Sequence, residues 1–443
     1  MIQEQFSQTL AYLYSLLPMY QRDGSVAFKK GLENTEKLCW ELGLPQWQFH
    51  SIHVGGTNGK GSVSSMLNSV LMESGYKTGL YTSPHLQSFT ERIRINGKEI
   101  SQRKVVDFVE KYRHLIESIS PSFFEFTVAM AFHFFAEAEV DIAVIEVGLG
   151  GRLDSTNIIK PEMSVITNIS YDHQAMLGDT LGQIAGEKAG IIKKYTPVVI
   201  GERHPETDSV FVEKAALEGA PLFFAQDTIK VTEAIPNLKG QEIRGVISRE
   251  EEQEEFAYQI DQRGNYQTKN LITTLKAIDV MIEDGWEIDA KAIKKGLAKT
   301  ATNSGLSGRM QKLSQKPLIF CDTAHNEAGV KDVLEQLTRI PHDQLHMVWG
   351  MVNDKDHDKI LALLPKNAKY YFVKPDVPRG LDAGKLAEKA AAYQLKGEIF
   401  NSVADGLIAA HQNAVVSEND LVYVGGSTFV VAEVVGKNEA AAV

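Results

Sequence analysis

A glycine-rich turn that carries a lysine is the part of this 443-residue sequence best suited to chemistry. Residues 52–62 read I-H-V-G-G-T-N-G-K-G-S, which is typical of a strand end, a tight turn and a helix start. Backbone N–H groups in such a turn approach a phosphate closely, and Lys60 adds a point charge. The spacing departs from G-x-x-x-x-G-K-[ST], because Val54 replaces the first glycine and Gly61 separates Lys60 from Ser62. We still expect nucleotide phosphate binding rather than a plain surface turn.

Acidic and imidazole side chains follow two further predicted strands. Glu146 stands near the end of an apolar run, just before the glycine-rich segment 148–154, and Asp172 and His173 follow a strand predicted to end at Ile169. Open α/β sheets bind ligands at the carboxyl ends of their strands. A buried glutamate is costly without a partner, so a metal cation is a natural one here. His173 alone would more often be structural, and only its neighbours make it a candidate ligand.

The helix end I-A-G-E-K-A-G-I (184–191) is a weaker candidate. Read alone, Lys188 simply complements the dipole at the end of an ordinary helix.

The lysine turn needs a strand before it and a helix behind it, and the sequence predicts both. Apolar residues recur at helical spacing from Val63 to Leu71, and Gly75 gives a C-terminal stop. Residues 91–100 indicate a hairpin with Asn96 and Gly97 in the turn. Short β-branched runs without strict alternation predict strands of a parallel sheet covered by helices, over Ser51–Val54, Ile142–Val147, Ser164–Ile169 and Val198–Ile200.

The second half of the chain repeats the α/β pattern after an interruption. From about 221 to 262 the pattern loosens into short polar–apolar alternations, and the acidic run 249–255 reads as a solvated loop or strand edge. Strands are then predicted over Leu318–Cys321, Met347–Trp349, Tyr370–Val373 and Leu421–Val424, with a helix marked by Val330, Val333, Leu334 and Leu337.

We therefore predict an α/β protein of two domains. A P-loop-type, mostly parallel sheet domain with a small antiparallel subdomain covers 1–300, and a smaller Rossmann-like α/β domain covers 313–443. The small, glycine-bearing residues within 301–312 predict the linker.

Composition excludes several classes of protein. The length exceeds what one hydrophobic core usually supports. No apolar run could cross a bilayer, and the N-terminus has neither a basic start nor an apolar signal core, so we expect a cytoplasmic protein. Cys39 and Cys321 are far apart and predict buried thiols rather than a disulfide or zinc site. The net charge of −11 argues against nucleic acid or an anionic membrane as partner.

Six motifs then occur in one order. They are G-T-N-G-K-G-S, S-P-H-L (83–86), E-R-I (91–93), E-V-G-L-G-G-R-L-D-S-T-N (146–157), T-N-I-S-Y-D-H (167–173) and E-K-A-G-I (187–191). Together they resemble the folylpolyglutamate synthase/dihydrofolate synthase family, within the Mur ligase superfamily of ATP-dependent amide-forming ligases. The resemblance spans about residues 1 to 434.

The resemblance implies a role for individual residues. Thr57, Asn58, Gly59, Lys60, Gly61 and Ser62 would hold the ATP phosphates, with Asn270 at the adenine and Arg309, Asp322 and His325 at the ribose and phosphates. Ser83, Glu146 and His173 match magnesium ligands, and Lys188 matches a lysine that is carbamylated and bridges a second magnesium. Arg92, His325 and Ser427 would hold the incoming glutamate, and Phe124 and Asp154 the folate. Lys188, His173 and His325 are the candidate catalytic residues. Two Mg²⁺ ions and ATP as substrate follow, and K⁺ is a further ion to test.

The sequence departs from the family pattern in two places. Leu306, Ser307 and Gly308 precede Arg309 where a Trp-Pro-Gly-like run is usual, and Thr323 and Glu327 replace a glycine and a proline. The side chains Arg309, Asp322 and His325 are retained.

The implied reaction is activation of a carboxylate. The carboxylate attacks the γ-phosphate of ATP, and the amine of L-glutamate then attacks the acyl phosphate. Metals, Lys60 and a helix N-terminus in one place would neutralise the charge that develops, and His325 is one candidate for the general base. We expect a monomer that acts on small molecules and adds both the first and later glutamates.

Two alternatives remain at this point. A cell-wall Mur ligase acting on a uridine-diphosphate-linked muramyl acid would share the lysine turn. A nucleotide-binding regulatory module would lack turnover, but it would not need Lys60, Glu146, His173 and Lys188 together.

Overall fold

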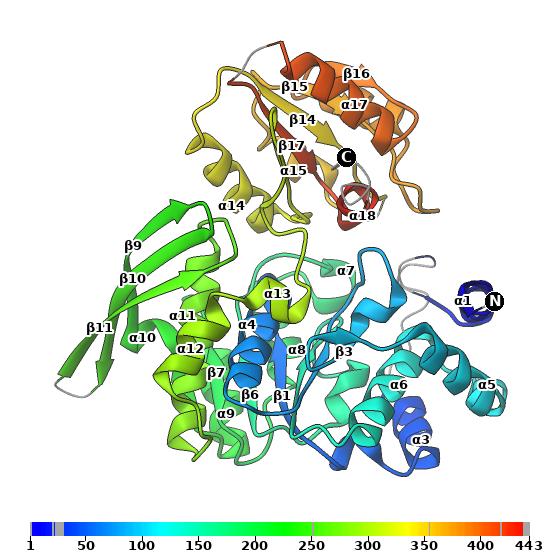
Figure 1. The fold of residues 1–443 in the computed structure, drawn as a ribbon, viewed down its shortest axis with the longest axis vertical. Helices are drawn as coiled ribbons and strands as arrows, with labels where there is room; N and C mark the ends of the chain where they lie inside the picture. Colours follow the sequence, from blue (N-terminus) through cyan, green and yellow to red (C-terminus); the bar gives the residue numbers. More distant parts are fainter. Residues whose placement is uncertain are drawn as a thin grey trace. The chain divides into compact units, whose positions relative to one another are not determined.

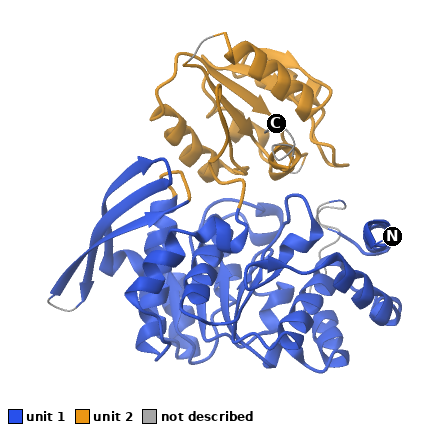
Figure 2. Cartoon of the chain, viewed as in Figure 1, with its two compact units in different colours: residues 1–261, 267–306 blue, residues 262–266, 307–443 orange. Residues whose placement is uncertain are grey.

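The structure is a computed structural model that describes residues 2–19, 22, 31–249, 252–353, 355–416 and 419–436. The chain divides into two compact units, coloured separately in Figure 2. Unit 1 contains residues 1–261 and 267–306, and unit 2 contains residues 262–266 and 307–443. The predicted linker, 301–312, includes the step from unit 1 to unit 2 after Leu306. Its first residues are helical, because α13 covers Thr300–Ser304. The domain bounds 1–300 and 313–443 stay a prediction.

Unit 1 is built on an eight-stranded sheet in the order β4-β3-β2-β5-β1-β6-β7-β8. The strands are β1 His50–Gly55, β2 Thr78–Tyr81, β3 Ile93–Ile95, β4 Lys98–Glu99, β5 Ile142–Glu146, β6 Met163–Ile166, β7 Val198–Ile200 and β8 Leu222–Phe224. All pairings from β2 to β8 are parallel, and the β3–β4 hairpin adds antiparallel strands at one edge. Asn96 and Gly97 both have positive φ in its turn, as the type I′ geometry requires.

Helices cover both faces of this sheet (Figure 1). The longer ones are α1 Ile2–Leu16, α3 Glu33–Glu41, α4 Lys60–Glu73, α5 Gln102–Ile119, α6 Phe123–Glu137, α8 Leu181–Ala189, α9 Asp208–Glu218, α11 Gln267–Glu283 and α12 Ala290–Leu297. The short ones are η2 Pro45–Trp47, η3 Phe89–Arg92, η4 Ser155–Ile158, α7 Gln174–Leu177 and α10 Ala225–Thr228. One core contains Ile52 and Val54 of β1 with α4 and α11, and another contains Ile145 of β5 with α5 and α6. Alternate residues of the central strands therefore enter different cores.

The loosened region forms a separate sheet in the order β11-β10-β9, with every pairing antiparallel. Its strands are β9 Ile229–Asn237, β10 Gly240–Arg249 and β11 Glu252–Ile260. Ile243, Phe256 and Ile260 join the core around α4 and α11, so one face is buried and the charged residues take the other. The small antiparallel subdomain predicted from the sequence is confirmed.

Unit 2 contains a six-stranded sheet in the order β12-β13-β17-β14-β15-β16. Its strands are β12 Gln311–Gln315, β13 Leu318–Cys321, β14 Leu345–Trp349, β15 Lys369–Phe372, β16 Gly397–Ile399 and β17 Leu421–Gly425. Only β12 runs antiparallel to its neighbour. The helices are α14 Glu327–Thr338, α15 His357–Leu361, α16 Ala383–Ala391, α17 Val403–Ala414 and α18 Thr428–Val435. This α/β arrangement confirms the predicted fold class.

Two further expectations are met in the described residues. Cys39 and Cys321 are buried and not disulfide-bonded, and burial raises the pKa of both thiols. A search of the described helices finds none with the length and apolar character needed to cross a bilayer.

Candidate active site

The lysine turn lies between β1 and α4, as predicted. Gly56 has φ of +133° and Gly59 has φ of +85° at the N-cap of α4, which side chains rarely allow. A Cβ on Gly56 would lie 1.9 Å from Thr167 Oγ1, so the turn packs directly on the segment after β6. The N–H groups of Thr57 and Asn58 donate to Asn168, to its carbonyl at 2.9 Å and its side-chain oxygen at 3.0 Å. Because Thr167 and Asn168 contact the lysine turn instead of continuing the strand, β6 ends at Ile166 rather than at the predicted Ile169.

Substitution of Gly59 with alanine should weaken ATP binding strongly. The new Cβ would lie 2.2 Å from Asn270 Oδ1, and the positive φ would add strain. We expect KM for ATP to rise by about tenfold or more, measured by initial rates of ADP release. Gly186→Ala is the matched control, because Gly186 is helical in α8 and has nothing within 4 Å of the added Cβ. Equal effects of the two substitutions would contradict this assignment.

Two lysines meet at one backbone carbonyl in this turn. Lys60 Nζ donates to Gly56 O at 3.1 Å and to Thr57 O at 3.0 Å, and Lys188 Nζ donates to the same Gly56 O at 2.9 Å. Lys188 comes from the last turn of α8, more than a hundred residues further along the chain. The structure therefore brings Lys188 to the lysine turn, whereas the local helix pattern suggested an ordinary helix end.

Lys188 is only 4% exposed, and burial with the nearby charge of Lys60 lowers its pKa to about 7. Asp172 and Asp154 oppose that shift. A large fraction of the amine is therefore neutral at neutral pH, and the neutral amine is the form that attacks carbon dioxide.

Glu146 lies at the end of β5, beside the turn. It is the last residue of that strand, and its register partner on β1 is Val54. The side chain is 5% exposed, and its Oε2 accepts a hydrogen bond from Ser83 N at 3.0 Å. The structure thus pairs two of the predicted metal ligands, Ser83 and Glu146, directly.

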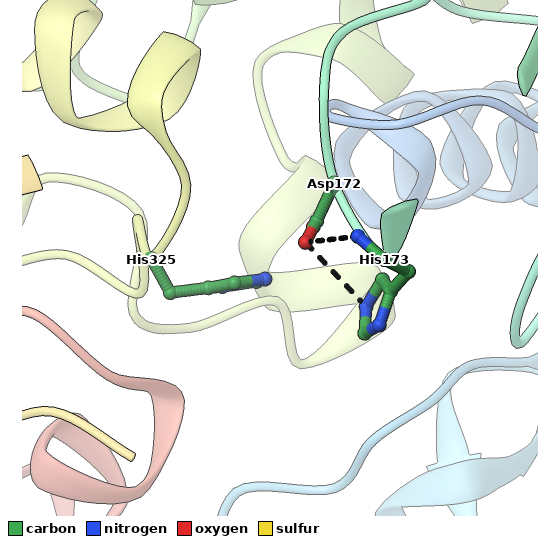
Figure 3. Close-up of side chains that lie close together, drawn as sticks. All are labelled: Asp172, His173 and His325. Carbon is green, nitrogen blue, oxygen red and sulfur yellow. Dashed lines mark hydrogen bonds and ion pairs between the residues drawn. The ribbon is translucent and has the colours of Figure 1, made fainter. Parts of the chain in front are cut away.

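Asp172 and His173 follow β6 on the segment that packs against the turn. Figure 3 shows the carboxylate of Asp172 turned back toward His173. Asp172 Oδ1 accepts a hydrogen bond from the His173 backbone N–H at 2.9 Å, and the ring Nε2 of His173 lies 3.7 Å from the same oxygen. His173 itself has φ of +51°. His325, also labelled in Figure 3, belongs to unit 2. Asp172 was missing from the predicted ligand set, although its position before His173 was a usable signal.

The candidate donors of unit 1 form two pairs, Ser83 with Glu146 and Asp172 with His173, and the chemistry of both pairs suits a divalent cation. Carboxylates from Glu146 and Asp172, the imidazole of His173 and the hydroxyl of Ser83 are oxygen and nitrogen ligands of the kind that magnesium and manganese bind. A carbamate on Lys188 would add another oxygen ligand. The fit rests on this chemistry and on the burial of Glu146.

The first turn of α11 contacts the lysine turn from the other side. Asn270 lies against Gly59, and its Nδ2 donates to Gln267 Oε1 at 2.8 Å. Gln267 Nε2 in turn lies 3.3 Å from Ser62 Oγ. Asn270, predicted to contact adenine, is therefore next to the lysine turn, and Gln267 is a further neighbour that was not among the predicted residues.

The residues predicted for the folate flank the segment after Glu146. A Cβ on Gly148 would lie 2.3 Å from the ring of Phe124, so Phe124 packs directly on that segment. Asp154 is 3% exposed and accepts hydrogen bonds from Leu149 N at 2.8 Å and Thr156 N at 3.0 Å. Burial raises its pKa despite these donors.

Arg92 is a buried guanidinium, 2% exposed, at the end of η3. Its Nε donates to His85 Nδ1 at 2.7 Å, and its Cζ lies 5.4 Å from the centre of the Phe123 ring. Burial and this positive charge hold the pKa of His85 well below its usual value. Among the described residues, no carboxylate forms an ion pair with Arg92. A buried cation with a neutral histidine and an aromatic ring for neighbours is suited to an anionic ligand.

Unit 2 holds Asp322 at the end of β13. Its Oδ2 accepts hydrogen bonds from Tyr266 Oη at 2.5 Å and Met310 N at 2.7 Å, and its Oδ1 accepts from Ala324 N at 2.9 Å. Burial raises its pKa. Tyr266 was not among the predicted site residues.

The other predicted residues of unit 2 lie at the ends of its strands and in the linker. Arg309 donates to Thr323 Oγ1 and to Gly308 O. His325 Nδ1 lies 3.0 Å from Thr323 O. Ser427 is the N-cap of α18 and accepts from Phe429 N at 3.2 Å. Thr323, the residue that replaces the usual glycine, is therefore a partner of both Arg309 and His325.

Comparison with known proteins identifies the family. The Mur ligase middle domain matches residues 54–278, and the Mur ligase glutamate ligase domain matches residues 308–428. The chain is 32% identical over 428 residues to the dihydrofolate synthase/folylpolyglutamate synthase of Bacillus subtilis, which covers 92% of this chain and 94% of that protein.

Solved structures agree with these matches. The structure of Escherichia coli FolC in complex with DHPP and ADP has a TM-score of 0.84 and 30% identity and covers 98% of both chains. The Yersinia pestis bifunctional folylpolyglutamate synthase/dihydrofolate synthase complexed with AMPPNP and Mn ion has a TM-score of 0.82 and 30% identity over the same shares. The resemblance seen in the motifs is confirmed: the chain belongs to the dihydrofolate synthase/folylpolyglutamate synthase family of Mur ligases and is a carbon–nitrogen ligase.

Proposed function

We propose that this ligase uses ATP to join L-glutamate to a reduced folate, and also to dihydropteroate. The observation that carries the proposal is the meeting of Lys60 and Lys188 at Gly56 O, beside Glu146 at the end of the neighbouring strand. Positive charge and metal-binding groups thus lie together at the turn before the N-terminus of α4, where a phosphate would be held. The relatives described above supply the substrate class.

In the proposed reaction the carboxylate oxygen of the folate attacks the γ-phosphorus of ATP, and the bond to the β,γ-bridging oxygen breaks, releasing ADP. The neutral amine of L-glutamate then attacks the acyl carbon, and phosphate leaves as the amide forms. Both anions in the first step repel each other, so Lys60 and the N-terminus of α4 lower the barrier by holding the phosphates.

A divalent metal fits the donors of unit 1. Glu146, His173 and Ser83 would hold it, with Asp172 next to His173, and a carbamate on Lys188 would hold a second. The metals supply neutralisation of the phosphate charge. We propose two Mg²⁺ ions and include K⁺ as an ion to test. Manganese in the Yersinia pestis structure supports a divalent cation.

The test is a phosphate-release assay with purified protein, ATP, magnesium and L-glutamate. Release should require tetrahydrofolate or dihydropteroate, run in parallel, and should match amide formation one to one. Turnover with a uridine-diphosphate-linked muramyl acid instead would refute the folate assignment, and ATP binding without turnover on any acid would favour a regulatory module. Activity with only one of the two folate substrates would reduce the proposal to a monofunctional enzyme.

Replacing Arg92 with methionine should raise KM for L-glutamate by about tenfold or more, because a charge-assisted hydrogen bond is worth about 1.5–3 kcal/mol. Steady-state rates at saturating ATP and folate would show it, with KM for ATP unchanged. Arg113→Met is a matched control, since Arg113 is exposed and lies over the ring of Tyr12. If KM for the folate rises in place of that for glutamate, Arg92 belongs to the folate site.

The remaining roles follow the same scheme. Thr57 to Ser62 and Asn270 would bind ATP in unit 1, and Phe124 and Asp154 would define the folate side. Arg309, Asp322, His325 and Ser427 are proposed for the nucleotide and the glutamate in unit 2, with His325 a candidate base. We propose a monomer that works in the cytoplasm on small molecules and not on nucleic acid or membranes.

A further inference from the structure

A buried histidine lies under the segment that follows Glu146 and has no place in the reaction above. His53 is in the middle of β1, is 0% exposed, and has Ile145 and Ser164 as register partners on the neighbouring strands. Ile52 and Val54, on either side of it, enter the core around α4. His53 therefore points to the opposite face, where its Nε2 lies 2.8 Å from Thr156 Oγ1.

Thr156 connects this histidine to Asp154. Its Oγ1 lies 2.5 Å from Asp154 Oδ1, and its backbone N–H donates to the same oxygen at 3.0 Å. The other carboxylate oxygen accepts from Leu149 N at 2.8 Å, and the N–H of Gly148 also faces the carboxylate. An ionised carboxylate has about four acceptor positions, so the partners within residues 148–156 occupy them all.

The donor inventory sets the direction of each hydrogen bond. Backbone N–H groups only donate, so three of the four partners of Asp154 stabilise its ionised form and oppose burial, which raises the pKa of this carboxyl. Thr156 then gives its hydroxyl proton to Asp154, and its oxygen is left to accept from His53. With these directions the proton of His53 lies on Nε2. The remaining Nδ1 is a buried acceptor with no hydrogen-bond partner among the described residues.

Burial and the charge of Lys193 lower the pKa of His53 to about 3, in agreement with a neutral ring at all physiological pH values. A neutral ring with its proton on Nε2 is a fixed donor. It orients the Thr156 hydroxyl and so leaves Asp154 one well-defined set of partners.

We propose that His53 is a positioning residue that acts through Thr156 and Asp154 to hold residues 148–154 in the shape that receives the folate. The effect on folate binding rests on the proposed function, in which Phe124 lies at the folate site. Phe124 packs on Gly148 of the same segment.

The kinetic test compares four variants. His53→Met and Thr156→Val each break the chain of hydrogen bonds and should raise KM for tetrahydrofolate about tenfold, with kcat and KM for ATP within about twofold. His53→Gln keeps an N–H donor at the Nε2 end and should stay near wild type. Ser164→Ala is the matched control. Ser164 is buried on the adjacent strand, but it donates to Ile191 O at 2.7 Å and takes no part in the hydrogen bonds between His53, Thr156 and Asp154.

The double variant His53→Met/Thr156→Val decides between a connected chain and general destabilisation. Its KM for tetrahydrofolate should be no higher than that of the worse single variant, because either substitution alone already interrupts the hydrogen bonds from His53 to Asp154. Additive increases, or an equal increase in Ser164→Ala, would overturn the proposal.

Two readouts do not depend on activity and separate this inference from the proposed function. Nitrogen NMR should place the His53 proton on Nε2 and show no titration between pH 5 and 9. Amide hydrogen exchange at Leu149 and Thr156 should speed up by about tenfold in His53→Met and not in Ser164→Ala. A proton on Nδ1, or unchanged exchange, would overturn the positioning role even if the wild-type enzyme uses folate. Absence of any folate-dependent turnover in the wild type would refute the proposed function and leave these two results standing.

Discussion

Replacing Lys188 with alanine should reduce folate-dependent phosphate release by about a thousandfold or more. Removal of a group that organises charge at the reacting phosphate costs about two to three orders of magnitude in other enzymes, and Lys188 would also take a metal ligand away. The measurement is kcat at saturating ATP, folate and glutamate. Lys194→Ala is the matched control, since Lys194 is close in sequence but has its ammonium over the ring of Tyr195, at the surface.

Two experiments with added compounds test whether the loss of activity in Lys188→Ala comes from loss of a carbamate. Acetate or formate should partly restore the alanine variant, because a small carboxylate can occupy the position of the carbamate. The wild-type enzyme should lose activity in buffer freed of carbon dioxide and recover it with bicarbonate. Full activity of Lys188→Ala, or a loss that no carboxylate repairs with no bicarbonate effect on the wild type, would refute the carbamate.

Lys188 should also leave a mark on the pH dependence of stability. Its pKa is about 7 in the folded chain, well below the ordinary value of 10.5. Between these values the unfolded chain holds a proton that the folded chain has released, so stability rises with pH across this window. Lys188→Met, which fills similar space without charge, should lack this rise and should melt higher than wild type near pH 7 in buffer without carbon dioxide. Equal pH slopes for the two proteins would contradict the shifted pKa.

Replacing Lys60 with methionine should lower kcat/KM for ATP by about a hundredfold or more. Its ammonium donates to the carbonyls of Gly56 and Thr57 in the turn. A phosphate-binding lysine stabilises the charge of the transferring group, and methionine keeps most of its bulk but none of its charge.

The matched control for Lys60 is Lys37→Met, an exposed substitution in α3. The loss should appear in both KM and kcat for ATP, while KM for folate stays within about twofold. If Lys60→Met changed only the folate KM, the lysine turn would not be the nucleotide site.

The strands were predictable where the sequence itself bounds them. Val198–Ile200 and Leu318–Cys321 were predicted to the residue, because each apolar run follows a proline directly. The turn at Asn96-Gly97 was also predictable locally, because this residue pair favours the positive φ angles that a tight hairpin turn requires. The end of β6 was missed by three residues, since Thr167 and Asn168 are extended in sequence character but are recruited to hold the lysine turn.

The site was predictable as a set of motifs, but its contacts were not. Nothing local distinguishes Lys188 from a lysine at any exposed helix end, and only the packing of α8 brings it to Gly56 O. The sequence placed Asp172 beside His173, but its hydrogen bond to the His173 backbone is a contact that only the structure gives. The partners of Asp154 and Asp322 arise from turns and from a distant tyrosine, which periodicity does not encode.

Residues 262–266 belong to unit 2, although residues of unit 1 precede and follow them in the sequence. A gene fragment that starts at Ser307 would therefore encode an incomplete body. It would lack Tyr266, and the buried carboxylate of Asp322 would lose its phenol donor. Recombination that swaps the C-terminal half between relatives must carry this five-residue excursion along, or inherit a matching tyrosine from the other parent.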